Sequence, residues 1–296
     1  MRVERRVSAT VIEWLGAAAD EGHRLGGKAR SLDRLARLGF TIPPGFCITT
    51  DAFAAHLATI PGAAADITAL PEEAARERLA GAFEVTPLGP DLLRSLDEAV
   101  GRLVAESPTI DAGEPRLAVR SSAIGEDGSA TSYAGLHDTA LDVLPNDVDA
   151  AIRRCWASLW SRRAIAYRLR HGRPLDGGGM AVVVQALVPA DASAVVFTRH
   201  PVTGTDEIVV TAVRGLGEMM ASGTVTPDTI IVDRWSLDVL DYTPGEDESA
   251  VGAVALSELV HQSLEVERQF GCAVDIEAAR AGGRWYLLQA RPITTR

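Results

Sequence analysis

Residues 274–294 read VDIEAARAGGRWYLLQARPIT, two largely apolar runs on either side of a Gly-Gly pair. Asp275 and Glu277 alternate on the first run, and Gln289 and Arg291 alternate on the second. Side chains two residues apart on a strand face the same side. If the two strands pair as a hairpin around the Gly-Gly turn, Glu277, Gln289 and Arg291 converge on one polar patch.

The residue types in this patch suit a metal and a phosphate. Oxygen atoms of Glu and Gln suit Mg²⁺, which takes a few protein oxygens together with phosphate and water. An Arg beside them suits a phosphate whose charge grows during transfer. The hairpin is therefore a candidate magnesium and phosphate site. The alternative is a half-exposed hairpin whose polar face only meets solvent.

Further strand-like runs precede the hairpin and give the second part of the chain its character. They are MAVVVQALV (180–188), SAVVFT (193–198), EIVVTAV (207–213) and TIIVD (229–233). A helix is expected over about residues 256–269. Together with the last hairpin strand, the runs predict a sheet of at least five strands.

The first part of the chain is richer in helix. Ala29, Leu32, Leu35 and Ala36 recur at helical spacing before Gly39, which predicts a helix over residues 28–38. An apolar stripe predicts one long helix over residues 148–170. A short strand is expected at 116–120. We therefore expect an α+β chain of two lobes, residues 1–175 and 176–296, the second built on a mainly antiparallel sheet.

Composition excludes several classes of protein. The 296 residues carry a net charge of −11, which argues against a general nucleic-acid binder. Three widely spaced cysteines without CxxC spacing indicate neither a disulfide framework nor a zinc site. The N-terminus has no signal-peptide pattern and no run approaches 18 apolar residues. A reducing cytoplasmic location and no membrane partner are expected.

The stretch GHRLGGKA (22–29) almost matches the P-loop, but Ala29 cannot supply the hydroxyl that such a loop uses to hold Mg²⁺. The plain alternative is a glycine-loosened helix start with a solvated Lys28. Two glycines before a helix nevertheless expose backbone N–H groups beside a cation, which suits an anion. Lys28 is therefore a candidate phosphate ligand.

A glycine-rich stretch, RSSAIGEDGSATSYAGLHDT (120–139), follows a short apolar strand. Such a loop can cover a polyphosphate with backbone N–H groups and hydroxyls, while Arg120 binds the negatively charged phosphate groups. The alternative is a flexible surface loop, although Tyr133 and Leu136 are costly to leave exposed. His137 could act as a general base, but a single histidine in a loop is more often an ordinary surface residue.

Two more polar residues stand in otherwise apolar or glycine-rich surroundings. Gln185 lies in VVVQALVP (182–189), a strand that suits either an adenine-binding edge or a core with one polar residue. Glu218 lies in GLGEMMASGTVTPD (215–228), where a carboxylate can bind ribose hydroxyls or face solvent.

The order of these stretches resembles a known family. GGKARSLDRLARLGFTIPPGFCITTDAF (26–53) resembles the opening of the ATP-binding domain of the pyruvate phosphate dikinase and phosphoenolpyruvate synthase family. AVRSSAIGEDGSATSYAGLHDT (118–139) resembles its glycine-rich loop, in wording nearest to rifampin phosphotransferase. VVVQALVPADASAVVFTRHPVTG (182–204), VRGLGEMMASGTVTPDTIIVDR (213–234) and the hairpin complete the set in order.

The resemblance implies an ATP-grasp-type fold with ATP held between two lobes and with Mg²⁺. By the motif match, Lys28, Arg120 and Arg291 contact phosphates, and Glu277 and Gln289 hold Mg²⁺. The match places Gly135, Thr139 and Ala140 in the loop that covers the phosphates. It places Gln185 and the backbone of Leu187 and Val188 at adenine, and Glu218 near the ribose.

In that family a histidine on a separate swivelling domain attacks the β-phosphoryl group of ATP, and AMP leaves. The phosphohistidine motif and the domain for the final acceptor are absent from this sequence. We therefore expect a phosphotransfer module that phosphorylates a histidine on a partner domain or chain. The alternatives are a non-catalytic sensor of ATP or AMP, and an ADP-forming ATP-grasp ligase.

Overall fold

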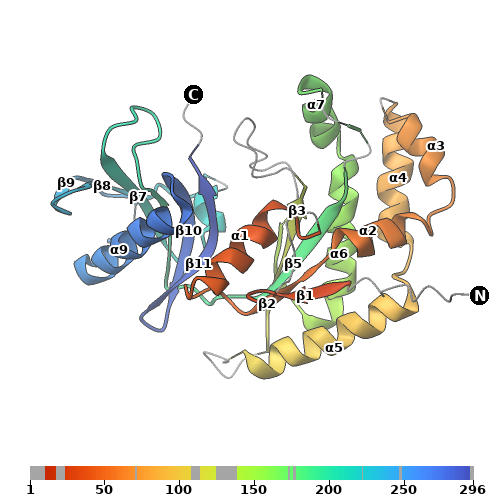
Figure 1. The fold of residues 1–296 in the computed structure, drawn as a ribbon, viewed down its shortest axis with the longest axis horizontal. Coiled ribbons are helices and arrows are strands. Elements are labelled where there is room, and N and C mark those ends of the chain that lie inside the picture. Colours follow the sequence, from red (N-terminus) through yellow and green to blue (C-terminus); the bar gives the residue numbers. More distant parts are fainter. Residues whose placement is uncertain are drawn as a thin grey trace, which may run out of the picture.

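The computed structural model describes residues 11–17, 24–70, 72–107, 114–124, 139–172, 174–175, 178–221, 223–246 and 249–293. Two antiparallel sheets, each with its own helices, lie on either side of a central helix (Figure 1). The expected α+β class with two lobes is confirmed. No helix in the described ranges is long and apolar enough to cross a membrane.

The first sheet has five strands in the order β1, β2, β5, β3, β4. They are β1 (Ile12–Trp14), β2 (Gly45–Ile48), β5 (Met180–Ala186), β3 (Leu117–Ala123) and β4 (Thr139–Val143). β5 is the middle strand and is almost entirely buried, because its valines pack on both faces. This strand follows the expected lobe boundary at residues 175 and 176, yet by its hydrogen bonds it belongs to the first sheet.

The second sheet has six strands in the order β11, β10, β6, β7, β8, β9. They are β11 (Arg284–Pro292), β10 (Val274–Ala281), β6 (Ala192–Phe197), β7 (Glu207–Arg214), β8 (Asp228–Asp233) and β9 (Val239–Thr243). Every neighbouring pair is antiparallel, as expected. Helix α9 (Ala253–Phe270) packs its apolar face on one side of this sheet (Figure 1). The other side of the sheet forms one wall of a cavity between the two lobes.

The remaining helices belong to the first lobe, apart from the short α8. They are α2 (Thr50–Leu57), α3 (Ala63–Thr68), α4 (Glu73–Val85), α5 (Pro90–Glu106), α6 (Val148–Ala157), α7 (Arg162–Arg170) and, after β7, α8 (Glu218–Ala221). The prediction of a single helix over residues 148–170 is wrong. A 3₁₀ turn at Ser158–Trp160 ends α6, and the Ser161 hydroxyl then accepts the Ala164 N–H to cap a new helix.

Aromatic rings fill the core beside α2, α4 and α6. Phe53 stacks on Phe83 with centroids 5.5 Å apart, and Trp156 donates its indole N–H to the carbonyl of Met180 at 3.0 Å. His56 is 3% exposed and lies among the rings of Phe83 and Trp156. Neither of its ring nitrogens has a hydrogen-bond partner within the described ranges. The bond from Trp156 joins this core to the middle strand of the first sheet.

Helix α1 (Gly26–Arg37) lies between the two sheets (Figure 1). Ala29 and Leu32 pack with β2 and β5, whereas Leu35 belongs to the core of the second lobe. The helix starts against β3, where Gly26 has φ +69° and a Cβ would lie 2.0 Å from the carbonyl oxygen of Ser122. Only glycine fits there, so the start of α1 is fixed to β3.

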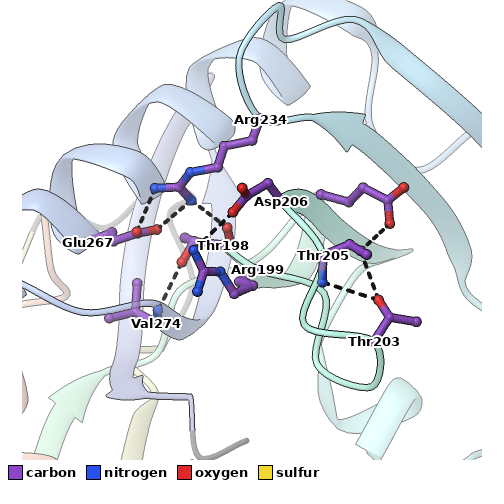
Figure 2. A network of polar contacts seen from close by, with 9 residues as sticks. Thr198, Arg199, Thr203, Thr205, Asp206, Arg234, Glu267 and Val274 are labelled. Carbon is purple, nitrogen blue, oxygen red and sulfur yellow. Dashed lines mark hydrogen bonds and ion pairs between the residues drawn. The ribbon is translucent and has the colours of Figure 1, made fainter.

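The side of the second lobe next to α9 is fixed by a polar network (Figure 2). Arg234, just after β8, makes two hydrogen bonds to Glu267 of α9 at 2.6 and 2.9 Å, and a third to the carbonyl of Thr198 at 2.7 Å. The Thr198 hydroxyl accepts the N–H of Val274 at 2.9 Å. These bonds join α9, β8 and the first residue of β10, which leads into the candidate site.

Candidate nucleotide site between the lobes

A cavity of about 510 Å³ lies between the two sheets. Its walls come from segments far apart in the sequence: the start of α1, strands β3, β4 and β5, and strands β6, β7, β10 and β11. The polar residues expected from the sequence gather at this one place. Those lining the cavity are Lys28, Arg120, Thr139, Gln185, Glu218, Glu277, Gln289 and Arg291, together with Leu187 and Val188.

The hairpin forms as expected and carries the polar face. Glu277 lies opposite Gln289, and Asp275 lies opposite Arg291, in the antiparallel pairing of β10 and β11. The register shifts between Glu277 and Ala278, just beyond the polar pairs. The two side chains expected to bind metal are therefore neighbours across the strands, and both line the cavity.

Arg120 crosses the cavity from the first sheet to the hairpin. Its guanidinium lies 3.0 Å from the Glu277 carboxylate and donates to the carbonyl of Leu288 at 2.8 Å. The Arg120 side chain is 14% exposed and that of Glu277 is 38% exposed. The carboxylate thus keeps an open side toward the cavity while one side is held by the guanidinium.

Arg291 is held by a second carboxylate, that of Asp275. The guanidinium lies 2.6 and 2.8 Å from Asp275 Oδ2 through two of its nitrogens. Burial raises the pKa of Asp275 above its usual range, although the positive charge of Arg291 opposes this shift. Asp275 was not expected as a functional residue. Its alternation with Glu277 was the available signal.

The donor set fits Mg²⁺ only in company with a phosphate. Within the described ranges no group of three His, Cys, Asp or Glu side chains could hold a metal by itself. Glu277 and Gln289 offer oxygens from two neighbouring positions, one of them a carboxylate. Mg²⁺ is commonly held by one or two carboxylates plus substrate phosphates and water, so this set fits it.

Lys28 lies in the first turn of α1, where β3 fixes the backbone. The Ser122 hydroxyl donates to the carbonyl of Leu25 at 2.8 Å and accepts the N–H of Ala29 at 3.0 Å. The Lys28 ammonium donates to the carbonyl of Ser121 at 3.2 Å. The helix start is thus capped by a strand side chain, and the lysine is directed along the strand that carries Arg120.

Gln185 lines the cavity from β5, the middle strand of the first sheet, and is 2% exposed. Its Nε2 donates to the carbonyl of Pro43 at 3.0 Å. A carbonyl can only accept a hydrogen bond, so the amide nitrogen must face Pro43 and the amide oxygen must face away from it. The N–H of Leu187 donates to the carbonyl of Arg116 at 2.9 Å, so this backbone donor is already used.

One expected residue, Ala140, does not line the cavity in the described part of the chain. Ala140 packs toward the core of the first lobe, while its neighbours Thr139 and Leu141 line the cavity. Successive residues of a strand face opposite sides, so Thr139 and Ala140 cannot both face the site. Gly135 lies outside the described residues.

Several apolar residues of the cavity were not expected from the sequence. They are Pro43, Ala118, Leu141, Leu216, Met220, Ala279 and Leu288, and the small polar residues Ser193 and Thr211 lie beside them. The inward positions of β6, β7 and β10 follow from strand alternation. The contributions of Pro43, Leu141 and Met220 depend on how the two lobes meet, which sequence patterns do not report.

Comparison with known proteins gives a consistent result. The family model described as "Pyruvate phosphate dikinase, AMP/ATP-binding domain" matches residues 22–296. The prodigiosin synthesizing transferase PigC of Serratia marcescens is 36% identical over 96% of this chain. The phosphoenolpyruvate synthase of Aeropyrum pernix is 36% identical over 77% of this chain.

The chain is shorter than these relatives. Its matches span 33% of the length of PigC and 29% of the Aeropyrum synthase. Among solved structures, a D-alanine–D-alanine ligase from Bacillus anthracis aligns with 90% of the chain at 12% identity and a TM-score of 0.35. That likeness is too weak to carry a structural argument.

Proposed function

Because the chain belongs to the family of the pyruvate phosphate dikinase AMP/ATP-binding domain, we propose that it binds Mg-ATP in the interlobe cavity and transfers phosphoryl groups to a histidine of a partner domain or chain. One observation supports this most. Three cations and two oxygen-bearing side chains, brought from three distant segments, line a single cavity. The cations are Lys28, Arg120 and Arg291.

In the proposed half-reaction, an imidazole nitrogen of the partner attacks the β-phosphorus of ATP. The bond from that phosphorus to the oxygen bridging the α-phosphate breaks, and AMP leaves with that oxygen. The γ-phosphoryl group later passes to water or phosphate, and the phosphohistidine carries the remaining group to a final acceptor. Mg²⁺ held by Glu277 and Gln289 would neutralise part of the negative charge of the phosphates.

The chain's own residues act by position and charge. Lys28 and Arg291 each present a cation at the cavity, and Asp275 orients the guanidinium of Arg291. Arg120 spans both lobes, so it couples their closure to the anion between them. Such prepositioned charges stabilise a transferring phosphoryl group without reorganisation during the reaction.

The test is AMP formation from ATP labelled at the α-phosphate. The acceptor is the part of the Aeropyrum pernix synthase outside the matched segment, expressed separately and checked for a cooperative thermal transition. We expect AMP with the parent chain and a loss of at least about 100-fold in Lys28→Ala and in Arg291→Ala. Matched controls are Arg30→Ala on the outer side of α1 and Arg284→Ala at the start of β11, both exposed.

Other outcomes of this experiment would indicate other functions. ADP with no AMP would favour a ligase acting through an acyl phosphate. Tight ATP or AMP binding with no turnover, and no effect of the acceptor, would favour a sensor. Variants that match the parent in ATP binding and in acceptor phosphorylation would contradict the proposed roles of Lys28 and Arg291.

A further inference from the structure

The arginines of this acidic chain are unevenly distributed. Residues 150–175 contain seven arginines and no Asp or Glu, whereas the whole chain has a net charge of −11. The described members lie on α6 and α7, the two helices that precede β5. A concentration of one sign of charge against the overall balance indicates a surface with a partner of opposite charge.

Not all of these arginines are available to a partner. Arg168 is 4% exposed and donates to the carbonyl of Leu175. Arg153 pairs with Asp149 at 3.2 Å and also reaches the carbonyl of Glu84. These two arginines serve the packing of the first lobe.

The outer side of α7 is different. Arg162 is exposed and pairs with Glu73 of α4, whereas Arg163 and Arg170 are exposed and have no ion pair within the described ranges. Arg163 and Arg170 are seven residues apart, which places them on one face of the helix. Leu169, whose exposed fraction is 54%, is seven residues after Arg162 and therefore lies beside it, next to this pair on the helix surface. We call Arg162, Arg163, Leu169 and Arg170 the α7 face.

This composition favours a protein over a nucleic acid. Arginine around an exposed apolar side chain is typical of the centre of a protein interface. A phosphate backbone would be bound by cations alone and would gain nothing from Leu169. The unpaired guanidinium groups call for carboxylates on the partner.

The chain that follows α7 leads toward the candidate site. The segment after α7 enters β5 at Met180, which pairs with Ala123, the last residue of β3. Arg120 lies three residues earlier on β3, a distance of about 10 Å along a strand. In Figure 1, α7 stands at the top of the first lobe, and β11, which ends just after Arg291, leads toward the same side.

We propose that the α7 face docks an acidic surface of the protein that carries the phosphoryl-accepting histidine, and so holds that histidine over the cavity, near Lys28, Arg120 and Arg291. This inference rests on the proposed function. It names a second contact, outside the cavity, that sets the affinity for the acceptor rather than for ATP. The length of the relatives beyond the matched segment leaves room for such an acceptor.

The experiment measures AMP formation as the concentration of the separately expressed acceptor is varied. In the double variant Arg163→Glu/Arg170→Glu, the KM for the acceptor rises at least about 10-fold at low salt, and the KM for ATP does not change. The increase shrinks as salt is added, because exposed charges are screened. Leu169→Ala raises the acceptor KM a further few-fold in a manner that does not depend on salt.

The control is Arg284→Glu, a single charge reversal next to the turn between β10 and β11, far from α7, and it is compared with the single variant Arg163→Glu. All variants must melt within about 2 °C of the parent. If the double variant fails to fold, the single variants Arg163→Gln and Arg170→Gln replace it, with smaller expected increases in the same KM.

The outcomes distinguish a failure of the docking contact from a failure of the proposed function. If no AMP forms with the acceptor, the proposed function and the docking contact fall together. If AMP forms and the arginine variants leave the acceptor KM unchanged, the docking contact alone is overturned. Loss of duplex DNA binding, or a change from dimer to monomer in sedimentation, with an unchanged acceptor KM would reassign the face to a nucleic acid or to a second copy.

Discussion

The guanidinium of Arg120 lies 3.0 Å from the carboxylate of Glu277, and this ion pair joins the two sheets across the cavity. Arg120 comes from the second-from-edge strand β3, and Glu277 from the hairpin at the edge of the other sheet. The carboxylate that we propose as a metal ligand is therefore also the carboxylate that pairs with a guanidinium of the other lobe.

Glu277→Gln keeps the size of the side chain and removes its charge. We expect the affinity for ATP in the presence of Mg²⁺ to fall at least about tenfold, about 1.4 kcal/mol, because the amide keeps an oxygen at this position but loses the negative charge that attracts the cation. Affinity measured with a chelator changes much less. Calorimetric titrations with and without Mg²⁺ make the comparison, with Glu258→Gln on the exposed side of α9 as the control. Unchanged magnesium dependence would contradict the role of Glu277.

Asp275→Asn tests whether Asp275 positions Arg291. The amide keeps the shape but loses the charge that holds the guanidinium at 2.6 Å. We expect the rate of AMP formation to fall by about 10-fold or more while the KM for ATP changes by less, because the loss lies in orientation rather than in binding. Asp275→Glu restores the charge and part of the rate. Equal losses in kcat and in ATP affinity would instead indicate a collapsed site.

Gln185→Leu tests how the base is selected. The Gln185 oxygen faces away from Pro43, and an acceptor in the cavity favours a purine with a 6-amino group over one with a 6-oxo group. We expect the preference for ATP over GTP to fall at least about tenfold, because the leucine cannot discriminate between them. Competition binding with both nucleotides measures the ratio. Gln269→Leu, on α9 and outside the cavity lining, should leave it unchanged.

His56→Phe tests the buried histidine of the first lobe. Burial and the charge of Arg153 lower the pKa of His56 below 6.5. As the pH falls, the unfolded chain therefore takes up a proton at this histidine at a higher pH than the folded chain does. The contribution of neutral His56 to the free energy of unfolding is fully present above pH 6.5 and is lost as the pH falls below it. We expect the free energy of unfolding, measured by urea at pH 5.5 and 7.5, to differ less between these pH values in the variant. His261→Gln, exposed on α9, should keep the parent's pH dependence.

Gly26→Ala tests the fixed start of α1. A Cβ there meets the carbonyl of Ser122 at 2.0 Å, at a φ of +69°. We expect a loss of more than about 2 kcal/mol in the free energy of unfolding, together with weaker ATP binding because Lys28 is displaced. The matched control is Gly81→Ala on α4, where nothing lies within 4 Å of the added atom. That substitution should stabilise the chain by about 0.5–1 kcal/mol.

Strand alternation predicted the hairpin well, because a period of two fixes which side chains share a face. Glu277 and Gln289 therefore met as expected. The same rule predicts that Thr139 and Ala140 face opposite sides of β4, and of these two residues Thr139 lines the cavity. The motif match included both residues, because a match between sequences does not say which side of a strand each residue faces.

The membership of β5 could not be predicted from its own residues. A run such as Met180–Ala186, apolar throughout, is typical of a strand buried on both faces, but it does not say which sheet buries it. The break after α6 was missed for a related reason. The apolar stripe continues through Trp160, while the turn depends on the Ser161 cap.

The middle place of β5 has a consequence for how this chain can be divided. The middle strand of the first sheet comes after all the helices of the first lobe in the sequence. In addition, Leu35 of α1 is part of the core of the second lobe. A cut between residues 175 and 176 would separate a sheet from the strand that unites its two halves. The first fragment would lack the middle strand of its sheet, and the second would lack Leu35 from its core, so we expect the intact chain to unfold in a single transition.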